Sequence, residues 1–203
     1  MTAAERLSGW ARRVPRGAVY AAGALPAALL AWRAATGGLG VDPVKALEHE
    51  LGLVALQFLV ATLAMTPLRR LAGVNLLKHR RPLGVLAFAY AVLHFLVWLV
   101  LDMQFLWGQI GADLVKRPYI TIGMLGLAAM IPLAVTSNDG ALRRMGAAAW
   151  RRLHRLAYLA GLAGAVHYLM VVKAWPPEPI LYLAAVLALL ALRVGRRRAR
   201  VAG

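Results

Sequence analysis

The sequence predicts an all-α integral membrane protein, a bundle of six transmembrane helices with both termini in the cytoplasm. Hydrophobic residues make up 61% of the 203 residues, whereas about 45–50% is typical of soluble domains. They fall into six runs, most of them long enough to cross a hydrocarbon core about 30 Å thick. Lysines and arginines gather in every second connecting segment, as the positive-inside rule requires of a multi-pass protein.

The predicted spans form one domain, residues 18–194, between a basic N-terminal segment and a basic tail. Pro26 is expected to kink the first span, and the Thr66-Pro67 pair to end the second. A cleaved signal peptide is the alternative interpretation of the first apolar run. The predicted spans are residues 18–35, 51–68, 83–101, 119–135, 153–172 and 180–194; the loops are residues 36–50, 69–82, 102–118, 136–152 and 173–179; the terminal segments are residues 1–17 and 195–203.

Basic residues fix the predicted orientation. The first, third and fifth loops hold only Lys45, Lys116, Arg117 and Lys173, while the termini and the even-numbered loops hold nearly all the others. Both termini are therefore expected in the cytoplasm. A net charge of +16 would suggest a nucleic-acid partner in a soluble protein. Here membrane topology accounts for it, so we expect contact with membrane lipids and no nucleic acid.

The stretch from Trp150 to Lys173 is predicted to be a spanning helix that carries His154 and His167. A charged group at the centre of such a helix costs roughly 2.5 kcal/mol or more, so an ionisable side chain there indicates a functional site. Small residues flank each imidazole and would admit another helix or a flat macrocycle. Ala157, Gly161 and Ala165 fall on the His154 face, and Ala160, Ala163 and Gly164 fall near the His167 face.

His94 and His167 are expected to meet at one level in the outer half of the membrane. His94 lies about 16 Å from the cytoplasmic end of its predicted span, and His167 lies a few residues from the outer end of its own. The chain has no cysteine, which excludes thiolate metal sites and thiol catalysis. A catalytic zinc usually has three protein ligands, and a histidine pair without an orienting acid is poor for nucleophilic catalysis.

Two neutral imidazoles from facing helices are good axial ligands for a haem iron. The alternative is that each imidazole only hydrogen-bonds to a neighbouring helix, as polar groups in membrane proteins often do. His154 is expected near the cytoplasmic edge, away from the other two histidines.

Several motifs resemble those of the MsrQ (YedZ) family. Its members are haem-binding membrane subunits of the bacterial periplasmic methionine-sulfoxide reductase system and belong to the ferric-reductase-like transmembrane group. The similarity covers nearly the whole chain, and the Lys-Arg-Pro-Tyr-Ile-Thr motif is quite specific. The motifs are Leu63–Arg69, Arg80–Gly84, Tyr90–His94, Lys116–Gly123, Pro132–Ser137 and Trp150–Tyr158, followed by His167.

The resemblance implies an electron-transfer subunit in the bacterial inner membrane. Such a subunit takes electrons from the quinone pool and passes them through b-type haem to a separate periplasmic molybdenum-cofactor reductase, which repairs oxidised methionines in envelope proteins. It implies haem ligation by His94 and His167 at the outer level, and a second haem if His154 also binds one. The family is also associated with FMN, and a cytoplasmic flavin reductase is a further candidate donor.

Two groups of basic residues are additional candidates. At the outer mouth, Lys116, Arg117 and Tyr119 are expected to dock the partner or to contact haem propionates. On the inner side, arginines could hold a flavin phosphate, a quinone or a lipid headgroup, with topology and lipid contact as the simpler explanation. These arginines are Arg69, Arg80, Arg81, Arg151 and Arg152.

Two other functions remain compatible with the sequence. One is a ferric reductase that acts directly on external metal and receives electrons from a separate flavin reductase. The other is a transporter or structural bundle in which the histidines are hydrogen-bonded and carry no cofactor.

Overall fold

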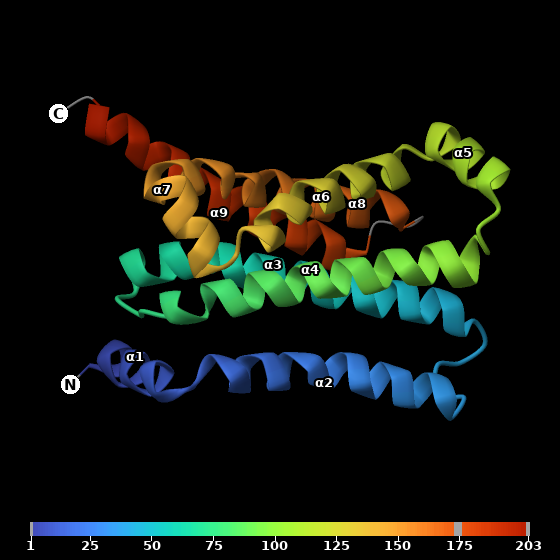
Figure 1. Cartoon of the computed structure of the whole chain (residues 1–203), viewed down its shortest axis with the longest axis horizontal. Coiled ribbons are helices and arrows are strands. Elements are labelled where there is room, and N and C mark those ends of the chain that lie inside the picture. The colour runs from blue at the N-terminus through green and yellow to red at the C-terminus, as the bar shows by residue number, and fades with distance from the viewer. Residues whose placement is uncertain (1, 173–175, 202–203) are drawn as a thin grey trace.

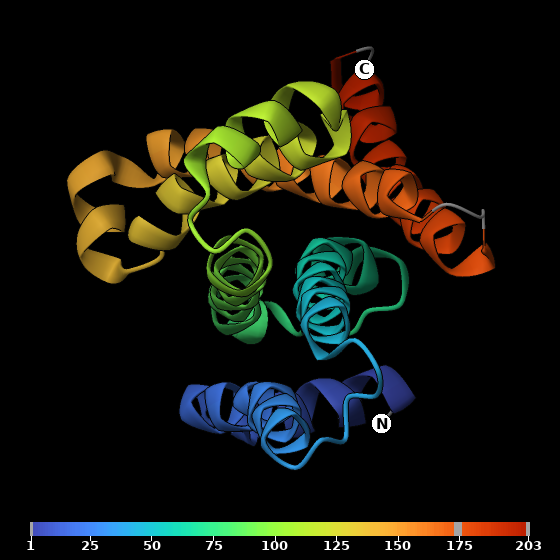
Figure 2. The same ribbon diagram turned by 90° about the vertical axis from the view of Figure 1, so that its right-hand side faces the viewer.

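The computed structural model describes residues 2–172 and 176–201, and within these ranges it contains helices and no β-strand. The helices lie in three layers (Figure 2): α2 forms one, α3 and α4 the middle one, and α6, α8 and α9 the third. The two termini lie at the same end of the bundle (Figure 1). That both termini lie on one side of the membrane, the cytoplasmic side, stays a prediction.

The elements follow one another along the chain with short connections. They are α1 (Ala3–Arg13), α2 (Arg16–Ala35), α3 (Pro43–Leu71), the 3₁₀-helix η1 (Leu77–His79), α4 (Arg80–Val97), the π-helix η2 (Trp98–Asp102), α5 (Trp107–Lys116), α6 (Pro118–Val135), α7 (Asp139–Leu153), α8 (Leu156–Val171) and α9 (Pro177–Val201).

Among the residues that the structure describes, four helical segments are long and apolar enough to cross a membrane, namely α2, α3, the continuous segment Leu77–Asp102 and α6. The fifth predicted span corresponds to α8, which is apolar but only 16 residues long. The sixth falls within α9. The membrane and all-α character are therefore confirmed, whereas a count of six crossings stays a prediction. The predicted loop cation Lys173 lies outside the described residues.

Several segments predicted as loops are helical. The loop 36–50 ends early because α3 already begins at Pro43, where the Asp42 carboxylate accepts a hydrogen bond from the Lys45 N–H at 3.0 Å. The N-terminal segment holds α1, which starts with a capping box between Thr2 and Glu5. Residues 102–118 contain α5 and residues 136–152 contain most of α7.

The second span does not end at Thr66-Pro67; α3 runs through Pro67 to Leu71. Proline has no N–H, so the carbonyl of Leu63, four residues earlier, loses its helical partner. The Arg193 guanidinium of α9 donates a hydrogen bond to this carbonyl, and another to the Tyr158 hydroxyl at 2.7 Å. A side chain from a different helix thus satisfies the freed carbonyl and lets α3 continue.

His154 does not lie on the spanning helix α8, contrary to the sequence prediction. It forms the C-cap of α7 and stands in the turn before α8, which starts at Leu156. The small residues of α8 are packed against neighbouring helices. A Cβ added at Gly126 of α6 would lie 3.3 Å from the Cβ of Ala163, and Gly161 faces the Leu63 side chain. These strips therefore serve close helix packing.

Tyr90 attaches α2 to the middle layer. Its hydroxyl donates to the carbonyl of Gly23 at 2.8 Å and accepts the N–H of Ala27 at 2.9 Å. These two backbone groups are four residues apart and would bond to each other in an unbroken helix. The Tyr90 hydroxyl is inserted between them beside Pro26, where a kink was predicted. Tyr90 is only 2% exposed, so the bridge is shielded from solvent.

We expect the Tyr90→Phe substitution to destabilise the protein by about 1–3 kcal/mol, because it leaves two shielded backbone groups without their partner. Thermal unfolding in detergent measures the loss. Tyr20→Phe, at an exposed tyrosine of α2, is the matched control and should leave the unfolding temperature unchanged. Equal unfolding temperatures for the Tyr90→Phe variant and the parent protein would show that the bridge contributes nothing.

Candidate functional site

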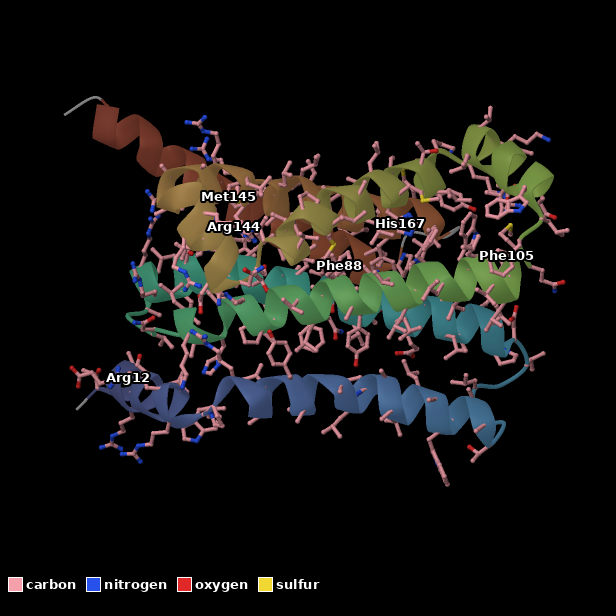
Figure 3. The ribbon with its side chains drawn as sticks, in the orientation of Figure 1. Arg12, Phe88, Phe105, Arg144, Met145 and His167 are labelled. Atoms are coloured by element: carbon pink, nitrogen blue, oxygen red, sulfur yellow. The ribbon has the colours of Figure 1, made fainter. Side chains whose placement is uncertain are left out.

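The structure brings His94 of α4 and His167 of α8 together. The centroids of the two imidazole rings are 6.0 Å apart, and the ring planes make an angle of 78°. His167 lies toward the Phe105 end of the bundle, away from the end that carries Arg12 and Arg144 (Figure 3). The predicted meeting of His94 and His167 at one level is therefore found, and we call these two residues the histidine pair.

Each ring of the histidine pair is held by a backbone carbonyl of another helix. The His94 Nδ1 lies 2.8 Å from the carbonyl oxygen of Glu48 on α3. The His167 Nδ1 lies 2.7 Å from the carbonyl oxygen of Tyr119 on α6. A carbonyl oxygen can only accept, so Nδ1 carries the proton in both neutral rings and Nε2 keeps its lone pair. Both imidazoles are thus fixed in the tautomer that binds a metal through Nε2.

A glycine makes room for each ring. A Cβ added at Gly52 would lie 3.1 Å from the His94 Nδ1, and one added at Gly123 would lie 2.9 Å from the His167 Nδ1. Each glycine stands four residues after the acceptor residue, one helical turn along the same face. The ring therefore lies over the glycine while its Nδ1–H reaches the carbonyl one turn away. The same pairing of an acceptor carbonyl with a glycine four residues later occurs on α3 and on α6.

Charged side chains hold the start of α3 in place beside His94. The Lys45 ammonium contacts the Glu48 carboxylate at 3.0 Å and the Asp102 carboxylate at 2.8 Å, so it joins α3 to η2. Asp102 closes the π-helix that follows His94 on the same continuous segment. This network therefore connects the segment that carries His94 with the turn of α3 in which the Glu48 carbonyl accepts the hydrogen bond from the His94 ring.

The chemistry of this donor set suits an iron held between two imidazoles. A metal–imidazole bond is about 2.0–2.1 Å long, so rings on opposite sides of one ion have centroids roughly 6 Å apart. The 6.0 Å separation of the histidine pair matches this value. Within the described residues there is no cluster of three or more histidine, aspartate or glutamate side chains that could hold a metal ion. A protein-only metal site of that kind is therefore not found in this part of the chain.

His154 lies apart from the histidine pair and is engaged differently. Its ring stacks on Trp150 with centroids 3.7 Å apart, and its Nε2 lies 3.0 Å from the Thr136 hydroxyl oxygen. That hydroxyl donates to the Pro132 carbonyl at 2.6 Å, so it accepts from His154, whose Nε2 carries the proton. The Nε2 nitrogen, which is free in His94 and His167, is therefore engaged in a hydrogen bond in His154.

Electrostatics keep His154 neutral near pH 7. Burial is the main cause, and the neighbouring charges of Arg80 and Arg81 add to it; together they lower the pKa of His154 to about 4. Arg81 also pairs with Asp139 at 2.8 Å and holds the pKa of that carboxyl below its usual value. His154 therefore belongs to a basic, hydrogen-bonded turn.

The other predicted residues lie at the two ends of the bundle. At the outer mouth, Lys116 and Arg117 are exposed, and Arg117 pairs with the buried Asp113 at 3.3 Å. Tyr119 takes part through its backbone carbonyl, which the sequence did not indicate. The structure does not bring the inner-side arginines to the histidine pair: Arg80 and Arg81 begin α4, whereas the other three are exposed on α3 or α7. These three are Arg69, Arg151 and Arg152.

Sequence reasoning missed Glu48, Gly52 and Gly123. Glu48 was assigned to a loop, and every residue has a carbonyl, so nothing in the sequence marks this one as an acceptor. The glycines offered a weak signal, since a glycine inside an apolar helix costs stability and often marks a close approach.

Comparisons with known proteins agree with this architecture. The family model described as "Ferric reductase like transmembrane component" matches residues 51–165. The protein-methionine-sulfoxide reductase heme-binding subunit MsrQ of Brucella ovis is 51% identical over 178 residues, which is 88% of this chain and 80% of that protein. The MsrQ proteins of Brucella canis and Brucella suis match to the same extent.

We expect Gly123→Ala to displace the His167 ring, because the new methyl group would stand 2.9 Å from Nδ1. The Tyr119 hydrogen bond then lengthens and the ring is no longer held in one tautomer. Nitrogen-15 NMR of the labelled imidazole measures this as loss of the Nδ1–H signal. Gly108→Ala is the control, since nothing lies within 4 Å of its added Cβ. An unchanged His167 spectrum in Gly123→Ala would refute the role of the glycine.

Proposed function

The chain belongs to the ferric-reductase-like transmembrane family and within it to the MsrQ subunits, and we propose that it carries electrons through haem held by His94 and His167. The observation that supports this most directly is the fixed tautomer of the histidine pair, which leaves a lone pair on Nε2 of two rings 6.0 Å apart. Hydrogen bonds from Nδ1 to the carbonyls of Glu48 and Tyr119 also make the imidazoles better ligands.

The polypeptide performs no bond chemistry in this proposal. Haem b supplies one-electron chemistry when bound, and the protein sets its ligation, burial and local dielectric. The donor is the quinone pool of the bacterial inner membrane. The acceptor is a methionine-sulfoxide reductase, since the related proteins are named as heme-binding subunits of a protein-methionine-sulfoxide reductase; its periplasmic location and molybdenum cofactor are what the family resemblance implies. With both termini in the cytoplasm, the histidine pair lies in the periplasmic half and is placed to reduce an external partner.

The exposed cations Lys116 and Arg117 stand at this outer end, where we propose that they help to dock the reductase or contact haem propionates. At the opposite end, Arg80 and Arg81 flank His154. The best candidate contacts for FMN lie there, because its phosphate needs cations. A flavin reductase in the cytoplasm would supply the electrons. His154 itself is proposed as a ligand only for a second haem.

We expect His94→Ala and His167→Ala each to abolish the haem bound in the outer half, because each removes one of its two axial ligands. His154→Ala should retain that haem, since its Nε2 is engaged by Thr136. The haem-to-protein ratio and the visible spectrum of the purified variants measure this. A colourless parent protein, purified from haem-replete cells, would overturn the proposed function. A His154→Ala variant without any haem would contradict the assignment of the pair.

Replacing Lys116 and Arg117 by glutamine should slow reduction of the sulfoxide reductase or weaken haem retention, because both charges lie at the outer end. The rate of haem oxidation by the purified reductase, measured at two salt concentrations, separates these effects. Arg143→Gln with Arg144→Gln, at the opposite end of the bundle, is the matched control. A normal rate, a normal haem content and an unchanged salt dependence would show that Lys116 and Arg117 neither dock the reductase nor contact the haem propionates.

A further inference from the structure

Four polar side chains form a continuous row between α3, α8 and α9. The His49 ring lies 5.8 Å from the Tyr168 ring, centroid to centroid, and Tyr168 lies 6.1 Å from Tyr182. The row ends where the Gln57 amide donates to the Tyr182 hydroxyl at 3.0 Å. His49 and Gln57 are exposed on the bundle surface, and the two tyrosines are half-buried. We call these four residues the polar row.

The polar row runs from the edge of the membrane core to its middle. His49 is six residues and Gln57 fourteen residues from the start of α3 at Pro43, which places them about 9 Å and about 21 Å along the helix axis. The hydrocarbon core is about 30 Å thick, so Gln57 is exposed near its middle. Exposed polar side chains at such depth are expensive and usually mark a substrate or proton route.

The polar row stands next to both halves of the histidine pair. His49 directly follows Glu48, whose carbonyl accepts the His94 proton. Tyr168 directly follows His167 on α8. The carboxylates of Glu50 and Glu178 lie near the Tyr168 hydroxyl at the outer end of the row. The polar row therefore shares the outer turn of α3 with the acceptor of the His94 hydrogen bond and shares α8 with His167.

We infer that the polar row binds the headgroup of a lipid-soluble quinol, the electron donor of the proposed function on which this inference rests. A quinol ring carries two O–H donors at opposite ends and a long apolar tail. The His49 imidazole and the Gln57 side-chain carbonyl oxygen are acceptors of the right kind, and Tyr168 and Tyr182 are aromatic neighbours for the ring. The tail remains in the lipid.

Electrons and protons balance as follows. Oxidation breaks the two O–H bonds of the quinol and releases two electrons and two protons, and the product is the quinone. The acceptor would be the haem that His94 and His167 are proposed to hold, which would take one electron at a time and pass each on to the external reductase before it accepts the next. The protons leave toward the outer aqueous phase, on the side where α3 begins and where Glu50 and Glu178 lie.

The simpler explanation is that Gln57 and Tyr182 only tie α9 to α3, since interhelical hydrogen bonds of this kind are common in membranes. It does not account for His49, which is exposed and forms no hydrogen bond within the described part of the chain. It also does not account for the position of the row beside both ligand helices.

The test is the rate at which decylubiquinol, a short-tailed quinol, reduces the haem of the purified protein in lipid nanodiscs, followed by stopped-flow absorbance. His49→Leu and Gln57→Leu are each expected to slow this rate about tenfold or more, because each removes a hydrogen bond to the quinol. Their spectra after reduction by dithionite should match that of the parent protein. Gln109→Leu, at an exposed glutamine of α5, is the matched control and should keep the normal rate.

A photoreactive azidoquinone provides a readout that does not depend on the haem. Labelling of peptides from α3, α8 and α9, lost in both variants and retained in Gln109→Leu, supports the site. Normal quinol reduction by both variants, or labelling confined to other helices, overturns it while the proposed function stands. A parent protein that holds haem but is not reduced by any quinol overturns quinol as the donor, and with it this site.

Discussion

The structure depends on the hydrogen bonds that join the two histidine rings to backbone carbonyls. The Nδ1–H groups of His94 and His167 donate to Glu48 and Tyr119, so each ring is held by a helix other than its own. One pair of bonds sets tautomer, ring orientation and the lone pair on Nε2 together. Gly52 and Gly123 permit the approach, and the Lys45 ion pairs hold α3 against η2.

The same constraint governs the rest of the bundle. In a low-dielectric environment every backbone polar group needs a partner, and prolines inside helices, among them Pro26 and Pro67, disturb that condition. Pro67 frees the carbonyl of Leu63, and Arg193 from α9 supplies the missing donor. Beside Pro26, the Tyr90 hydroxyl bridges Gly23 and Ala27. In both cases the hydrogen-bonding side chain comes from another helix, so the interrupted helix is joined to a neighbouring helix at that point.

The two ends of the molecule differ in chemistry. The end of the bundle near Phe105 holds the histidine pair, one end of the polar row and the exposed cations Lys116 and Arg117. The opposite end holds a basic turn in which His154 stays neutral beside Arg80 and Arg81. The histidine pair and the basic turn are thus separated along the length of the bundle.

The sequence by itself determined the membrane class, the long apolar helices and the approach of His94 to His167, but not α1, α5 or α7. Hydropathy and charge are properties of local segments, and depth follows from counting residues along a helix. It failed at His154, because the break between α7 and α8 has no proline, and the Trp150–Thr136 contacts that hold the turn join separate elements. Only the tertiary structure identified Glu48 and Tyr119 as acceptors and Gly52 and Gly123 as the space beneath the rings. Every residue has a backbone carbonyl, and the packing of one helix against another decides which carbonyl accepts the hydrogen bond from a histidine ring.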